Sequence, residues 1–310
     1  MNQHSTGKGL RTLHLTDNRR QQDGWERDAL AMLRTGNIDT AIDALRVHGR
    51  IHQAPDSETL RAELVSDYLN LRANTENSYD VAILALSRAD VAHLNALARA
   101  ALIAQGELGA TPLHLRADTG DLAVGEDSLE MRTGDLVIIG RNDNRLGLYN
   151  GTRGVVTAIN VEAGSLTLHT HDDRHVTITA TWAARHDLSH AYAMTLHKAQ
   201  GLTVDHALLY GSQALTREAG YVGLSRGRRN NHVYATTREM SAHDGECDYA
   251  IRNPVADQQQ AIADLTRRLH TSRSHQLASH QTGAWRTPIT QDDTRTLLEG
   301  RSDDHQPIPG

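Results

Sequence analysis

Polar residues crowd a short stretch of this chain immediately before the apolar run Ala207–Tyr210. The stretch contains Gly201, and a strand that ends in a glycine turn exposes backbone N–H groups that can approach a phosphate closely. The alternative is a turn in which Gly201 is needed only for its dihedral angles, but a turn alone does not explain the preceding Thr-x-His. The polar residues of this stretch are Thr195, His197, Lys198, Gln200, Gly201 and Thr203.

A second polar group follows the apolar run Tyr221–Leu224, which ends abruptly at Ser225. Arg226 and Arg228 come next, and their guanidinium groups are planar and always charged. Such a group at the end of a strand suits stabilisation of the charge that develops on a transferred phosphoryl group. The alternative for both arginines is a surface salt bridge with no role in catalysis, and this alternative has more weight for Arg228 than for Arg226.

Buried strands are the elements that must position these groups. The runs Ala207–Tyr210 and Tyr221–Leu224 each have polar residues at one end, which predicts two buried parallel strands with side chains presented at a sheet edge. Open α/β sheets bind ligands in that kind of place. Val81–Leu86 predicts a further buried strand, and Ser87 then caps a helix. Upstream, helices are expected from about residue 22, from residue 37 and from residue 57.

The pattern changes at Gly134 to short strands separated by turn residues, which predicts a small antiparallel β-barrel between two α/β stretches. His169, His171, Asp173 and His175 alternate there and invite a metal site. An Asp-Asp hairpin turn would break that alternation, so we expect a polar outer face and no metal. The expected strands are Leu136–Ile139, Gly154–Ile159, Ser165–Thr170 and His175–Thr181.

The two polar segments together resemble motifs V and VI of superfamily 1 DNA helicases. The matching patterns are T-x-H-x-x-Q-G-x-T at 195–203 and Y-V-G-L-S-R-x-R at 221–228. The resemblance is to the RecD-like branch, which includes the helicase half of the conjugative relaxases called TraA or MobF. It implies contacts to single-stranded DNA by Thr195, His197 and Lys198, and a DNA-phosphate contact by Arg88.

The resemblance also implies an ATP-facing group of residues. Gln200 and Gly201 would face the ATP phosphates across the domain cleft. Arg226 matches the arginine finger of motif VI, and Arg228 is the weaker candidate for the same role.

A second arginine is implied by residues 15–21, which are similar to the family's strand-then-Asn-x-Arg motif. Arg20 is the better match by register and Arg19 the second choice, while a solvated helix entry is the alternative. The resemblance places Arg20 on the remnant of the first RecA-like domain and Arg226 on the second, so that the two approach one ATP from different sides.

The implied fold is α/β, with the RecA-like parallel sheet of a helicase second motor domain and an inserted small SH3-like β-barrel. The R-N-D and Y-N-G patterns within 134–143 and 149–154 are similar to that insertion. The expected domains are 1–75, a remnant of the first RecA-like domain with connecting helices; 76–130 and 186–240, the second RecA-like domain; 131–185, the barrel; and 241–310, a helical and then partly disordered tail.

Two elements that this family needs for ATP hydrolysis do not occur in the sequence. Thr6-Gly7-Lys8-Gly9 is not a G-x-x-x-x-G-K-[ST] loop, and no acidic pair follows an apolar strand to hold Mg²⁺. We therefore expect ATP and Mg²⁺ to bind only together with an N-terminal helicase or relaxase portion. The chain is then part of a longer relaxase–helicase, a non-enzymatic DNA-binding or regulatory module derived from a helicase, or a subunit that completes an ATPase in trans.

The composition limits the partners further. A net charge of −6 argues against a general polyanion-binding surface, so nucleic acid needs a local groove. The one cysteine, Cys247, suits a reducing cytoplasm. The longest apolar region, 81–104, carries Arg88, Asp90 and Arg99, which excludes a membrane span. We expect a cytoplasmic protein whose partner is single-stranded DNA and which makes no membrane contact.

Overall fold

The computed structural model describes residues 20–115, 129–236 and 254–272. Three predicted features lie outside the described residues: the motif residues 15–19, which include Arg19; Cys247; and the part of the expected tail beyond residue 272. Within the described part, no helix combines the length and the apolar character that crossing a membrane requires.

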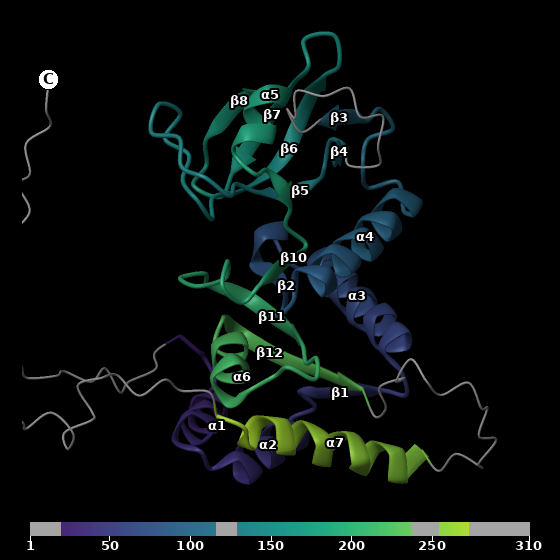
Figure 1. Ribbon diagram of the computed structural model, residues 1–310, viewed down its shortest axis with the longest axis vertical. Helices are drawn as coiled ribbons and strands as arrows, with labels where there is room; N and C mark the ends of the chain where they lie inside the picture. Colours follow the sequence, from purple (N-terminus) through teal and green to yellow (C-terminus); the bar gives the residue numbers. More distant parts are fainter. Residues whose placement is uncertain (1–19, 116–128, 237–253, 273–310) are drawn as a thin grey trace, which may run out of the picture. The chain divides into compact units, whose positions relative to one another are not determined.

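A five-stranded parallel sheet forms the base of the fold (Figure 1). The order β1-β12-β11-β2-β10 places β2 between β11 and β10, so the chain leaves this sheet after β2 and returns to it at β10. The prediction that 81–86 and 207–210 share one sheet is confirmed by the β2–β11 pairing. The strands are β1 Ile51–Ala54, β2 Val81–Ala85, β10 Ala193–Thr195, β11 Val204–Tyr210 and β12 Gly227–Thr236.

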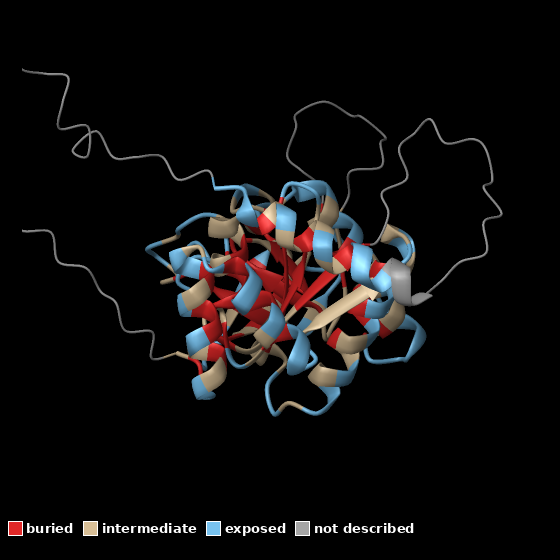
Figure 2. Cartoon of the chain, turned by 90° about the horizontal axis from the view of Figure 1, so that it is seen from below, coloured by how far each residue is buried: buried red, intermediate tan, exposed pale blue. Residues whose placement is uncertain are grey.

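Helices cover both faces of this sheet (Figures 1 and 2). Side chains alternate along a strand, so Ile83 packs toward one face and Leu84 toward the other. The Ile83 face packs against α3 Ser57–Ala73 and α4 Arg88–Ala104. The Leu84 face packs against α1 Gly24–Thr35, α2 Ile38–Val47, α6 Arg217–Leu224 and α7 Pro254–His270.

A second, antiparallel sheet is inserted between β2 and β10, with strand order β8-β7-β6-β5-β9. Its core is formed by residues such as Val137, Val156 and Leu168. Strands β8 and β9 are edges that do not pair with each other in the described residues, so the sheet is not a closed barrel. The elements are β5 Leu136–Ile138, β6 Arg153–Asn160, β7 Ser165–Thr170, β8 His175–Thr179, α5 Ala180–Arg185 and β9 Ser189–His190, with a separate pair of β3 Leu113–Leu115 and β4 Leu129–Met131.

The prediction of a strand at Tyr221–Leu224 is wrong, because these residues end helix α6. Thr216 caps that helix by accepting a hydrogen bond from the N–H of Ala219. A short apolar run cannot be distinguished from a buried helical turn by periodicity alone. The strand begins at Gly227, so Arg226 lies between a helix end and the start of β12 instead of at the carboxyl end of a strand.

The expected boundary at residue 75 does not separate two compact units. Strand β1 pairs with β12, and α1 and α2 contribute Leu30, Leu33 and Ile38 to the same core as Leu84 of β2. The polar Ile51–Ala54 segment gave no apolar run and was not predicted as a strand. In space, the described residues before 75 belong to the layered domain of the parallel sheet.

The predicted helix boundaries upstream agree well with the structure. Gly36 follows α1 with φ +93°, a conformation that favours glycine. Ser87 caps α4, because its Oγ accepts a hydrogen bond from the N–H of Asp90 at 3.0 Å. Asp56, one residue before the predicted start, caps α3.

Replacing Leu84 by alanine tests the central position of β2 in the layered core. Leu84 is fully buried, so L84A should lower the free energy of unfolding by about 2–5 kcal/mol. The control is V47A, whose side chain is 72% exposed and whose effect should stay within about 0.5 kcal/mol. Urea unfolding followed by circular dichroism measures both, and equal small effects would contradict the packing described.

Candidate nucleic-acid interface

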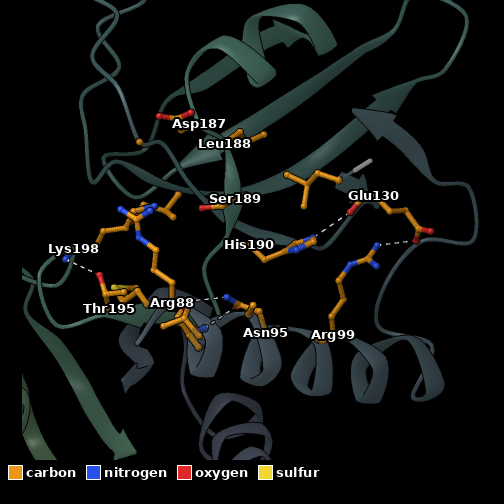
Figure 3. A pocket seen from close by; sticks show the side chains of 18 of the residues that line it. Arg88, Asn95, Arg99, Glu130, Asp187, Leu188, Ser189, His190, Thr195 and Lys198 are labelled. Atoms are coloured by element: carbon orange, nitrogen blue, oxygen red, sulfur yellow. Dashed lines mark hydrogen bonds and ion pairs between the residues drawn. The ribbon is translucent and has the colours of Figure 1, made fainter. Parts of the chain in front are cut away.

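A groove of about 1200 Å³ lies between α4, the end of β10 and the segment that leads back from the second sheet (Figure 3). The four residues expected to contact nucleic acid all line it: Arg88, Thr195, His197 and Lys198. The opposite wall includes Gly140 and residues 187–190. The groove thus lies outside the carboxyl end of a parallel strand, where open α/β sheets bind ligands.

Local hydrogen bonds explain how the β10 end presents its side chains. The Oγ1 of Thr195 accepts a hydrogen bond from the N–H of Lys198 at 3.2 Å, and its carbonyl accepts one from Ala199. The resulting turn leaves the His197 and Lys198 side chains exposed. Gly201 closes the turn with φ +83°, so its dihedral angles alone require glycine, as the alternative interpretation held.

The exposed nitrogen-bearing side chains at this end of the groove are available to an anion. Arg88, the first residue of α4, is exposed, as are His197 and Lys198. Within the described ranges, none of these three side chains forms an ion pair with a carboxylate. Arg88 and Lys198 make a local positive region on a chain whose net charge is −6.

Asn95 was not predicted to have a role, yet it connects helix α4 to strand β10 at this end of the groove. Its Nδ2 donates to the carbonyl of Ala193 at 3.0 Å, and its Oδ1 accepts from the N–H of Ala193 at 2.9 Å. The buried amide thereby pairs with the outer edge of β10 as a neighbouring strand would. The one sign of this role in the sequence was a single amide side chain beside the apolar stripe of the α4 helix.

A buried ionic network closes the other end of the groove. Arg99 Nε lies 3.0 Å from Asp135 Oδ1, and Arg99 Nη2 lies 2.9 Å from Glu130 Oε1. Asp135 is fully buried and also accepts the Tyr192 hydroxyl at 2.6 Å. Burial by itself raises the pKa of Asp135, but the nearby His190 imidazole, the hydrogen bond from the Tyr192 hydroxyl and the Arg99 guanidinium bring that pKa below its ordinary value. The network links α4 to the second sheet.

Arg20 and Arg226, the two expected phosphate-facing arginines, lie next to each other. Arg20 Nη1 donates to the carbonyl of Ser225 at 2.5 Å, and Arg226 Nη2 donates to Ser225 Oγ at 3.2 Å. Burial, and then the nearby charge of Arg20, lower the pKa of Arg226. Both arginines therefore belong to one domain, and the expectation that they sit on two separate domains is not what the structure shows.

A buried polar cluster holds these arginines together. Gln21 Nε2 donates to the carbonyl of Gly227 at 2.8 Å, and the N–H of Asn231 donates to Glu26 Oε1 at 3.1 Å. Burial raises the pKa of Glu26, while the Asn231 hydrogen bonds oppose that rise. Sequence reasoning missed this cluster because its members are isolated polar residues with no motif.

The remaining expected ATP-facing residues are dispersed. Arg228 forms ion pairs with Asp205 at 2.7 Å and Asp80 at 3.4 Å, so the salt-bridge alternative describes it well. Gln200 is exposed on the turn before Gly201. The groove lining includes none of these residues, nor Arg20 or Arg226.

The histidine-rich hairpin has an ordinary structural role. Asp173 has φ +60° in the expected turn, and its carboxylate lies 2.8 Å from His169 Nε2. The rings of His169 and His175 stack across β7 and β8 with centroids 4.6 Å apart. Among the described residues, no group of three or more His, Cys, Asp or Glu side chains is arranged to hold a metal ion.

Sequence and structure comparisons give the chain's relatives. No protein-family model matches it. The conjugal transfer protein TraA of Rhizobium radiobacter is 34% identical over 230 residues, which are 73% of this chain and 20% of TraA. The RecBCD subunit RecD of Mycolicibacterium smegmatis is 28% identical over 228 residues, which are 68% of this chain and 37% of RecD. A crystal structure of Bacteroides Pif1 helicase with ADP-AlF3 and single-stranded DNA matches with a TM-score of 0.46 at 20% identity, and covers 69% of this chain and 49% of that one.

By sequence the chain is similar to part of several helicase-type proteins, namely the TraA, Pif1 and RecD proteins. Within that class it resembles the TraA conjugal transfer proteins, and it spans about a fifth of the length of the TraA relatives it matches, at 20%, 19% and 20%. The resemblance based on the motif V and motif VI patterns is confirmed.

The lowered pKa of Asp135 gives a pH prediction. A carboxylate whose pKa falls on folding adds stability above its ordinary value of 3.8, and this contribution disappears as the pH drops through the folded-state value. D135N should cost about 3–5 kcal/mol at pH 7, because Arg99 loses a charged partner. The difference from wild type should shrink below pH 3.8.

Urea unfolding at several pH values measures this difference. D43N is the control, because Asp43 is an exposed partner of Arg46 and its loss should change little. A D135N defect that is independent of pH would contradict the ionised state assigned to Asp135.

Proposed function

We propose that the groove binds the backbone of single-stranded DNA as part of a helicase motor. The observation that carries the proposal is the convergence of Arg88 from α4 with Thr195, His197 and Lys198 from the end of β10 on one groove. Two segments separated by about a hundred residues in sequence, the second expected from its motif to contact DNA, thus meet around one space.

The chemistry of the lining supports a nucleic-acid ligand. Guanidinium, ammonium and hydroxyl groups donate to phosphate oxygens without reading base identity, so they set position and not sequence. The groove floor adds apolar groups, including Val91, Ala96 and Met194, against which sugars and bases can pack. Because the chain has a net charge of −6, attraction to a polyanion needs a local positive region such as this groove.

A second part of the proposal concerns ATP. Arg20 and Arg226 form a pair of adjacent cations beside Ser225, which suits a polyphosphate, while Gln200 and Gly201 lie on the turn after β10. ATP and Mg²⁺ would supply the phosphoryl group and its counter-charge. The chain itself offers charge stabilisation only, because its sequence has no G-x-x-x-x-G-K-[ST] loop. The phosphate cradle would come from an N-terminal helicase or relaxase portion, in cis or in trans.

The inserted sheet would correspond to the SH3-like barrel of RecD-like helicases, in an open form. A non-enzymatic DNA-binding or regulatory module is the second candidate function. It is favoured by the pairing of Arg228 with Asp205 and Asp80, which removes one of the three candidate arginines from phosphate chemistry.

Salt dependence of DNA binding tests the groove. R88A/K198A should weaken binding of a fluorescent oligothymidine and reduce the slope of log K against log salt by about 1.4, because each lost phosphate contact contributes about 0.7. The matched control is R46A/R267A, which removes two exposed cations, on α2 and α7, that do not line the groove. Equal losses in both variants would reject the groove as the binding site.

ATP hydrolysis in a completed motor tests the arginine pair. With the segment that carries the phosphate-binding loop fused or supplied in trans, R226A should lose about three to five orders of magnitude in kcat while still binding nucleotide. R228A should be milder, because Arg228 is already paired with carboxylates. Normal turnover by R226A would remove Arg226 from the proposal, and the DNA-binding module would then be the better account.

A further inference from the structure

An exposed aromatic side chain stands on the loop 141–151, between β5 and β6. Tyr149 is 55% exposed, and within the described ranges its ring and hydroxyl form no hydrogen bond, ring stack or cation–π contact. Few large apolar side chains in the described ranges are so open to water, and the others are Val47, Ile103 and Val161. Its exposed ring offers a face against which a planar ligand can pack.

Side chains within the loop hold its backbone in one shape. The carboxylate of Asp143 accepts hydrogen bonds from the N–H groups of Arg145 and Leu146 at 2.8 and 3.1 Å. Its other oxygen accepts Trp182 Nε1 at 2.6 Å. Asn142 Oδ1 accepts the N–H of Asn150 at 2.7 Å. These contacts explain the R-N-D and Y-N-G patterns of the sequence, and they mean that Tyr149 is presented by a preformed scaffold.

The same loop begins at the wall of the DNA groove. Gly140 lines that groove, and the preceding Ile139 exchanges backbone hydrogen bonds with Gly151 and Thr152. Tyr149 is therefore two residues from backbone that pairs directly beside the groove wall, a span of roughly 7 Å in an extended chain. Arg141 is anchored to Asp187, another groove residue, at 2.7 Å.

The charge of the loop suits the same ligand. Arg145 is exposed and has no carboxylate partner within the described ranges. Arg174 donates to the carbonyls of Leu146 and Gly147 at 3.2 and 2.8 Å and so braces the loop, while its own charge is paired with Asp172 at 2.7 Å. By contrast, the lining of the groove itself contains no Phe, Tyr or Trp, so a stacking partner for bases is not provided there.

We propose that Tyr149 is a stacking site for a nucleobase of the single strand whose backbone lies in the groove. The inference rests on the proposed function and adds a contact to bases that the groove residues do not supply. A tyrosine face stacks on any base, so the site would add affinity without sequence preference. Arg145, on the same loop, would hold a phosphate of the same strand.

Neutral aromatic stacking and charge neutralisation have different salt signatures, which makes the test specific. Y149A should weaken binding of an oligothymidine by about tenfold with an unchanged salt slope, because a neutral ring releases no counterions. Y149F and Y149W should bind as the wild type does. An oligonucleotide with abasic residues should bind Y149A and wild type equally. V161A, which truncates a 52% exposed apolar side chain in the turn between β6 and β7, is the matched control.

The outcomes separate this inference from the function on which it rests. If R88A/K198A weakens binding and Y149A behaves as V161A does, the stacking site is rejected and the groove stands. If R88A/K198A binds as the wild type does, the groove itself is rejected. If Y149A lowers the salt slope, or if Y149F binds as poorly as Y149A, the loop contributes something other than ring stacking, and the inference fails.

Discussion

The pairing of Asn95 with Ala193 is the contact on which the candidate interface depends. Strand β10 is a short edge strand, and its outer N–H and C=O groups would be left without partners if the Asn95 amide did not bond to both. That amide fixes α4 at a set distance from the β10 end. Arg88 lies about two helical turns before Asn95 on the same face of α4, and Thr195 lies at the strand end, so both are held around the same space.

The inserted sheet is tied to this frame by charge as much as by apolar packing. Asp135 is fully buried and would be costly alone, but Arg99, Tyr192 and His190 surround it. Since Arg99 stands on α4 and Asp135 begins the second sheet, the network sets the position of the outer groove wall. The hydrogen bonds of this network are directional, so they hold the inserted sheet in one orientation relative to the groove.

Sequence reasoning predicted the features with strong local signals. The buried strands at 81 and 207 and the Ser87 cap follow from apolar runs and capping chemistry. The DNA contacts of Thr195, His197, Lys198 and Arg88 came from the family resemblance and stay predictions, and only the fold shows that these residues line one groove. It could not predict β1, whose residues are mostly half-buried at a sheet edge, or the helical state of Tyr221–Leu224, which tertiary packing decides. The Arg99–Asp135 and Gln21–Gly227 contacts join isolated polar residues far apart in the chain, and only the fold shows them.

The most direct test of the central claim is where single-stranded DNA touches the chain. Photocrosslinking of an oligonucleotide that contains 4-thiothymidine, followed by mass spectrometry of the crosslinked peptides, reports those positions. The account predicts crosslinks in peptides that cover residues 86–100 and 187–200, which line the groove. Crosslinks confined to α7 or to β1, with none in those two segments, would contradict it.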